Sequence, residues 1–148
     1  MSNGTRNVSA NENSKERLIV IRTVFAATCL MLFPAFASAE GDPEAGETVF
    51  RKCKACHAVG EGAENKVGPV LNGIVGRQAA SVEGFGYSPV LISLSEEGLV
   101  WTPEELDAFL TKPRDYAKGI KMTFAGLRKE DDRANIIAYL ATFEDNGS

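Results

Sequence analysis

The feature that most constrains this chain is its single His, which closes the run Cys53-Lys54-Ala55-Cys56-His57. A C-x-x-C-H run is typical of a c-type haem attachment site. The two thiols can add to the two vinyl groups of one haem, and His57 is then held beneath the iron as its proximal ligand. One covalent haem c, attached through Cys53 and Cys56, is therefore the expected cofactor.

Two other interpretations of a C-x-x-C pair have less support in this sequence. The pair can be a redox dithiol or half of a zinc site. A thioredoxin-like dithiol belongs in a β-α-β context, and no stretch of this chain alternates convincingly as a strand. A structural zinc site needs four ligands, and beyond residue 39 the chain has no second Cys pair and no second His. Haem attachment leaves no ligand unexplained.

The first 39 residues have the layout of a secretory signal peptide. Residues 1–22 are polar with four cations, residues 23–36 are apolar, and Ala37-Ser38-Ala39 supplies the small residues that a signal peptidase recognises. We expect cleavage after Ala39 and export to the periplasm, an oxidising compartment. The alternative is an uncleaved anchor at the periplasmic face of the inner membrane, because residues 18–36 approach the ~20 that a membrane helix needs, although Arg22 interrupts them.

Without residues 1–39 the chain has 109 residues, a length that suggests one domain. It then holds 12 Lys and Arg against 18 Asp and Glu, so its net charge is −6 before the haem propionates are counted. Such a surface is a poor partner for nucleic acid. Cys29 leaves with the apolar run, so no Cys remains for a disulfide framework. We expect a monomer.

Helix signals and long loops predict an all-α fold. Pro43, Pro89 and Pro103 each follow a capping residue and are expected to begin helices. Thr102 and Glu105 have the spacing of a capping box. The helix that begins at Pro89 is expected to end at Gly98.

The helix that begins at Pro103 is expected to stop at Pro113, and a last helix is predicted from about 131 to 143 by its i, i+3, i+4, i+7 apolar pattern. On the first helix, Val49, Phe50 and Cys53 are expected to share a face. Gly46, one turn before Phe50, favours close approach of another helix. The Gly-rich segment 60–86 is long for a loop in a compact domain, which suits a segment that wraps a cofactor.

Met122 is the best candidate for the second axial ligand of the iron. It lies 65 residues after His57, between Gly119 and Gly126. The alternative is a core Met, but core Met residues usually sit on helices. Ligation by the thioether favours iron(II), raises the haem potential and fills both axial positions. A peroxidase or gas-binding protein would need an open position, so we expect no catalysis at the iron.

These motifs together resemble the class I cytochromes c of the bacterial cytochrome c2 and mitochondrial cytochrome c type, over about residues 41–143. The resemblance implies that residues 40–148 form a small class I cytochrome c domain, with N- and C-terminal helices packed together and long loops around one haem. The segments that carry it are Gly46, Phe50, 53–57, 68–71, 76–77, 84–87, Trp101, Pro113, Tyr116, 121–126 and 137–140.

The resemblance also assigns haem-binding roles to four further residues. Pro69 is expected to accept a hydrogen bond from Nδ1 of His57, which orients the imidazole and raises its basicity. Arg77, Tyr87 and Trp101 are expected to surround a buried propionate, since a carboxylate out of water needs a cation and hydrogen-bond donors. The alternatives are a plain loop proline and ordinary core aromatic residues.

In function, the resemblance implies an electron carrier that serves membrane respiratory or photosynthetic complexes. The donor would be a cytochrome bc1 complex, and the acceptor an oxidase, a reaction centre, a peroxidase or a reductase. A basic ring around the haem edge would steer docking to acidic partners, although a mixed solvated surface is the alternative. The basic residues near haem-contacting segments are Lys52, Lys54, Lys112, Arg114, Lys118, Lys121, Arg128 and Lys129.

Two departures from the family concern the Met122 segment. Phe109 stands where many relatives have a Tyr near the Met ligand, which removes one hydrogen-bond donor. Lys118 stands where relatives usually have Pro, so we expect a less rigid loop. A lysine such as Lys118 or Lys121 could then replace Met122 at high pH.

Overall fold

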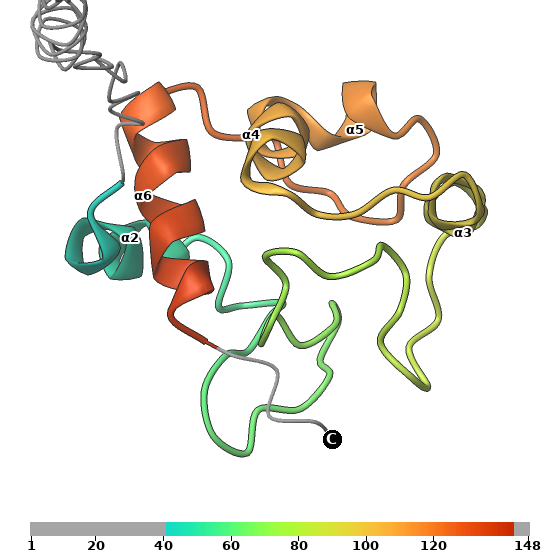
Figure 1. Cartoon of the computed structure of the whole chain (residues 1–148), viewed down its shortest axis with the longest axis horizontal. Coiled ribbons are helices and arrows are strands. Elements are labelled where there is room, and N and C mark those ends of the chain that lie inside the picture. The colour runs from blue at the N-terminus through green and yellow to red at the C-terminus, as the bar shows by residue number, and fades with distance from the viewer. Residues whose placement is uncertain (1–40, 144–148) are drawn as a thin grey trace, which may run out of the picture. The chain divides into compact units, whose positions relative to one another are not determined.

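The computed structural model describes residues 41–143, which form five helices joined by long loops (Figure 1). The only β pairing in this range is an isolated bridge between Gln78 and Val100, and the predicted all-α class is confirmed. No helix among these residues is long and apolar enough to span a membrane. The predicted signal peptide lies outside the described residues. The helices are α2 (Pro43–Phe50), α3 (Pro89–Glu96), α4 (Pro103–Thr111), α5 (Pro113–Tyr116) and α6 (Glu130–Ala141).

Three helices begin where a capping residue precedes proline. The Asp42 carboxylate accepts a hydrogen bond from the Glu44 amide at 2.9 Å and caps α2. Thr102 caps α4 by accepting from the Glu105 amide at 3.2 Å. The Glu105 carboxylate does not complete the capping box, because it accepts a hydrogen bond from the Tyr116 hydroxyl instead. Ser88 precedes α3 but makes no side-chain cap.

Some helix bounds differ from the sequence prediction. Helix α2 ends at Phe50, and Cys53 follows in a run of turns over 51–56 rather than on the helix. Pro113 ends α4 as predicted, and it also begins α5, a single turn that was not predicted. Helix α6 covers 130–141, so the 131–143 prediction extends two residues too far and Phe143 lies beyond its end. A pattern of apolar residues does not reveal where the backbone leaves the helix.

Helices α2 and α6, from opposite ends of the domain, pack directly against each other (Figure 1). A Cβ on Gly46 would lie 2.6 Å from Cβ of Tyr139 and would collide with the Asn135 carbonyl. The Phe50 and Tyr139 rings lie with their centroids 5.5 Å apart. The expected close approach of the two helices at Gly46 is therefore confirmed.

Helix α6 also holds α4 in place. The Arg133 guanidinium donates to Asp107 on α4 at 2.6 Å and to the Leu127 carbonyl at 3.0 Å. The buried apolar side chains form one core cluster, whose members include Trp101, Phe109 and Ile136. Helices α2, α4 and α6 contribute most of these side chains, and the loop residues Ile74 and Ala79 belong to the same core.

Candidate functional site

The turns after α2 bring the two thiols and the imidazole of the C-x-x-C-H run together. The amides of Cys56 and His57 both donate to the Cys53 carbonyl at 3.0 Å, which closes the segment into a tight turn. Cys53 is half-buried and Cys56 is exposed, and the two are not joined in a disulfide. One thiol thus faces the interior and the other the surface, with the imidazole beside them.

The His57 imidazole is held in place by the backbone at Gly68 and Pro69. Its Nδ1 lies 2.8 Å from the Pro69 carbonyl oxygen, and because a carbonyl only accepts, Nδ1 carries the proton. A Cβ on Gly68 would lie 2.7 Å from this nitrogen, so only glycine lets the backbone pass so close. Burial lowers the pKa of His57, partly opposed by the Pro69 hydrogen bond. The His57 imidazole is therefore neutral, and its Nε2 is available to bind a metal.

The Cys53 thiol lacks the character of a redox dithiol. Burial raises its pKa to about 11, against a smaller opposing effect of Lys52. Reactive dithiols instead have a lowered thiol pKa that favours the thiolate. Within residues 41–143, no group of three or more His, Cys, Asp or Glu side chains lies close enough together to hold a metal ion.

Met122 lies in the loop between α5 and α6, half-buried against the apolar core. Lys121 ties one side of this loop to the 84–87 segment by donating to the Gly86 carbonyl at 2.8 Å and the Tyr87 carbonyl at 3.2 Å. On the other side, the Leu127 amide donates to the Leu110 carbonyl at 2.8 Å. The loop is therefore anchored on both sides of Met122.

Arg77 is linked to Trp101 through the backbone and influences Tyr87 through its charge. The Trp101 amide donates to the Arg77 carbonyl at 2.9 Å, and the indole is buried. Burial raises the pKa of Tyr87, and the nearby Arg77 charge opposes this rise. The Arg77 guanidinium donates to the Asn72 carbonyl at 2.6 Å and the Val70 carbonyl at 3.1 Å. The Trp101 ring packs against Phe109 and Tyr116, and the Tyr87 ring packs against Phe85, so a shared propionate site formed by Arg77, Tyr87 and Trp101 remains a prediction.

Ser88 was not identified from the sequence. The residue is only 2% exposed, and its hydroxyl is the only buried side-chain polar atom without a hydrogen-bond partner among the described residues. Because it precedes Pro89, the sequence suggests a helix cap, but that cap does not form. An unpaired buried hydroxyl costs free energy unless a bound group satisfies it. Beside Tyr87, it fits a ligand that brings a polar group into the interior.

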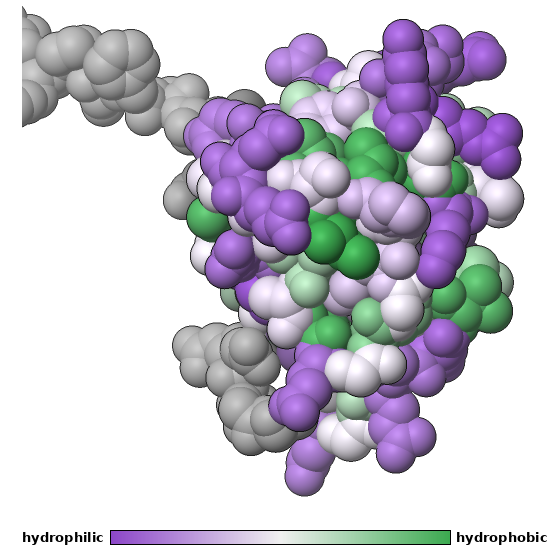
Figure 2. All heavy atoms as spheres, turned by 90° about the vertical axis from the view of Figure 1, so that its right-hand side faces the viewer, coloured by the Kyte–Doolittle hydropathy of each residue, from purple (hydrophilic) through white to green (hydrophobic). Residues whose placement is uncertain are grey.

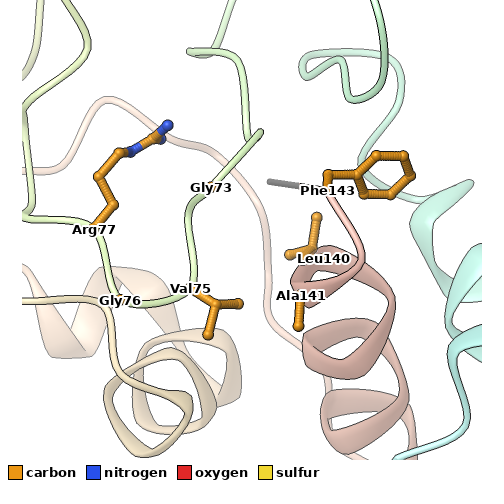
Figure 3. Close-up of a pocket in the computed structure, with 7 residues that line it drawn as sticks. All are labelled: Gly73, Val75, Gly76, Arg77, Leu140, Ala141 and Phe143. Carbon is orange, nitrogen blue, oxygen red and sulfur yellow. The ribbon is translucent and has the colours of Figure 1, made fainter. Parts of the chain in front are cut away.

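A pocket of about 390 Å³ lies between the 73–77 segment and the end of α6 (Figure 3). Val75 and Arg77 line one side, and Leu140, Ala141 and Phe143 line the other. The Gly73 amide donates to the Phe143 carbonyl at 2.6 Å and joins the two sides. Arg77 lines this pocket, whereas Cys53, Cys56, His57 and Met122 do not.

The basic residues do not all remain free for a partner. Lys52 pairs with Asp132 at 3.0 Å, and Lys112 pairs with Asp115 at 2.5 Å. Lys121 is held by two carbonyls. The others predicted for the ring are exposed, namely Lys54, Arg114, Lys118, Arg128 and Lys129. Figure 2 shows the face that bears α3, on which apolar and neutral side chains lie toward the middle and hydrophilic ones around the margin.

Known proteins resemble the chain over nearly all of the described range. No protein-family model matches it. It is 54% identical to cytochrome c-550 of Ancylobacter novellus, over 72% of this chain and 99% of that protein. It is 52% identical to cytochrome c2 of Agrobacterium tumefaciens (strain II Chrys), over 68% of this chain and 91% of that protein. The solved structure of cytochrome c2 from Rhodospirillum centenum matches with a TM-score of 0.66 and 44% identity, over 71% of this chain and 100% of that one.

Proposed function

Because this chain belongs to the class I bacterial cytochrome c2 family, we propose that it carries single electrons between membrane respiratory or photosynthetic complexes. It is a single-haem c-type cytochrome with haem c attached through Cys53 and Cys56. The proposed donor is a cytochrome bc1 complex. The proposed acceptor is a terminal oxidase, a reaction centre or a reductase.

The observation that carries this proposal is the fixed imidazole of His57. Its Nδ1 is held by the Pro69 carbonyl at 2.8 Å, which leaves Nε2 as the nitrogen for the iron. We assign His57 and Met122 as the two axial ligands. When bound, the haem supplies a reversible one-electron change at its iron.

The remaining site residues hold the haem and keep water away from it. Arg77, Tyr87 and Trp101 would supply a cation and two donors for a propionate, and Ser88, next to Tyr87 in the sequence, has an unpaired buried hydroxyl. The Lys121 hydrogen bonds restrain the Met122 loop. Residues locked by such contacts keep one geometry in both redox states, which is the main requirement for fast electron transfer without bond chemistry.

We also propose that the mature protein works in the periplasm after cleavage at Ala39. The support for this is the arrangement of a polar segment, an apolar run and Ala37-Ser38-Ala39 in the sequence. An anchored carrier is the alternative. Mass spectrometry of the N-terminus after expression with its own leader distinguishes the two, because cleavage leaves Glu40 as the first residue.

The transfer function is tested with a purified cytochrome bc1 complex and the oxidised holoprotein. Reduction that requires quinol, shows saturation and weakens with added salt supports the proposed donor. Failure of the reductase to reduce the protein, while ascorbate reduces it normally, would remove this donor from the proposal. His57 ligation is judged separately, by spectroscopy.

A further inference from the structure

We propose that Asn72 is a positioning residue for the haem site, because its side chain and its backbone together hold two groups of that site in place. The two groups are the Pro69 carbonyl, which orients His57, and the Arg77 guanidinium. The proposal rests on the electron-carrier function above, since it takes His57 as the iron ligand. It adds to that function a residue outside the attachment motif on which the orientation of the ligand depends.

The Asn72 carboxamide makes two hydrogen bonds to the backbone of a single residue. Its Oδ1 accepts from the Gly60 amide at 2.8 Å, and its Nδ2 donates to the Gly60 carbonyl at 2.9 Å. The side chain thus pairs with Gly60 as a peptide group of a neighbouring antiparallel strand would. Both bonds are partly buried, so their loss would leave the Gly60 amide and carbonyl poorly satisfied.

These two bonds close the base of a loop that lacks regular structure. Residues 60–72 contain no helix or strand. Beside the Asn72 pair, the Leu71 amide donates to the Ala58 carbonyl at 3.0 Å. Closing a loop costs chain entropy, which the bonds at its base must offset. The Asn72 side chain therefore helps to set the separation between the segment that follows His57 and the segment that follows Pro69.

The hydrogen bond that orients His57 joins the same two segments. Pro69 lies three residues before Asn72, and His57 lies three residues before Gly60. The Asn72–Gly60 pair and the bond between Nδ1 of His57 and the Pro69 carbonyl, at 2.8 Å, are successive links between them. If the first link is removed, the segments can separate and the second link opens more often. Asn72 acts on the iron ligand in this way without touching its ring.

The backbone of Asn72 holds Arg77 as well. The Arg77 guanidinium donates to the Asn72 carbonyl at 2.6 Å and to the Val70 carbonyl at 3.1 Å. The next amide, of Gly73, donates to the Phe143 carbonyl at 2.6 Å and fixes the chain beyond Asn72. One connected hydrogen-bond network therefore runs from Gly60 through Asn72 to the cation proposed for the propionate, and the bonds of such a network support one another.

The test compares Asn72→Ala with Asn135→Ala in the reduced holoprotein. Asn135→Ala is the matched control, because it also removes a carboxamide oxygen that accepts from a backbone amide, that of Asp42 at 2.7 Å, at the contact of α2 with α6. The quantity is the rate at which the Nδ1 proton of His57 exchanges with deuterated water, followed by proton NMR. The Leu140 amide, buried in α6, reports global unfolding in the same spectra.

We expect Asn72→Ala to raise the exchange rate of the His57 proton about tenfold, as the loss of roughly one hydrogen bond implies. The Leu71 amide should accelerate with it, and the Leu140 amide should accelerate less. In Asn135→Ala the His57 proton should accelerate no more than the Leu140 amide does. Asn72→Asp keeps an acceptor for the Gly60 amide but loses the donor. It should shift the His57 rate in the same direction and replaces Asn72→Ala if that variant does not take up haem.

A wild-type His57 exchange rate in Asn72→Ala, or an increase no larger than that of the Leu140 amide, would overturn the positioning role and leave the carrier function intact. A wild-type spectrum without the ring N–H signal of a haem-bound His would overturn the ligation of His57 and the positioning role together. The measurement needs no bc1 complex, so its outcome is independent of the proposed donor.

Discussion

Nδ1 of His57 lies 2.8 Å from the carbonyl oxygen of Pro69, twelve residues further along the chain. This hydrogen bond sets the tautomer, because the carbonyl can only accept. It depends on Gly68, which lets the backbone pass against the ring. The orientation of the proposed iron ligand therefore depends on a backbone contact from a loop.

Gly68→Ala should disrupt this arrangement. The new Cβ would lie 2.7 Å from Nδ1, so the ring or the loop must shift, and overpacking of this kind costs about 1–3 kcal/mol. Denaturant unfolding of the holoprotein measures the loss. Gly86→Ala is the matched control, since nothing lies within 4 Å of its Cβ position, and it should change stability by less than about 0.5 kcal/mol. Equal stabilities of the two variants would contradict this account of Gly68.

Gly46→Ala should destabilise the α2–α6 contact, against the usual trend. In a helix interior the change normally adds up to about 1 kcal/mol of stability. Here the Cβ would lie 2.6 Å from Cβ of Tyr139 and would strike the α6 backbone, which cannot move locally. Thermal unfolding should therefore give a lower midpoint for the variant. A higher midpoint would mean that the helices have room to separate.

Replacement of Met122 at high pH should involve Lys118 rather than Lys121. Lys121 donates to two carbonyls, whereas Lys118 is exposed and has no hydrogen bond to another described residue. We expect Lys118→Gln to raise the pH at which the sulfur–iron absorption is lost. Lys121→Gln, which frees the loop, should lower that pH. An alkaline titration checks both, and a wild-type band that survives throughout would end the hypothesis.

Tyr116 should make the stability of the folded protein decrease at high pH. Burial, together with the hydrogen bond to Glu105, raises its pKa to about 12 from an ordinary value of 10. The protonated phenol is favoured in the folded state, so its contribution is complete below pH 10 and is lost as pH rises toward 12. The stability difference between wild type and Tyr116→Phe should be constant below pH 10 and shrink above it. A difference that stays constant to pH 12 would contradict the assignment.

Local sequence signals predict the helix starts well and the helix ends less well. Asp42-Pro43 and Thr102-Pro103 contain their own caps, so α2 and α4 begin where expected. Helix α5 is one turn and too short to show a period. Glu105 has the spacing of a capping box, yet its carboxylate bonds Tyr116, eleven residues away. A hydrogen bond between residues so far apart in the sequence cannot be predicted from the spacing of a local motif.

The site residues that lie within one short motif can be predicted from the sequence, whereas the contacts that the long loops make cannot. The C-x-x-C-H run identifies the two attachment cysteines, Cys53 and Cys56, by itself. The contacts of Gly68 with His57 and of Lys121 with the 84–87 segment join loops with no periodicity, so only the folded chain reveals them. Ser88 was missed because Ser before Pro suggests a helix cap. Axial ligation by His57 and Met122 and the propionate roles remain predictions.

The most direct test is the absorption spectrum of the purified holoprotein, oxidised and reduced, beside that of Met122→Ala. The account predicts a low-spin c-type spectrum for the wild type, with the weak band of a bond between Met sulfur and iron(III). That band should be absent in Met122→Ala, and the midpoint potential should fall, because the thioether favours iron(II). A high-spin wild-type spectrum without the band would mean an open iron position and would contradict the assignment of Met122.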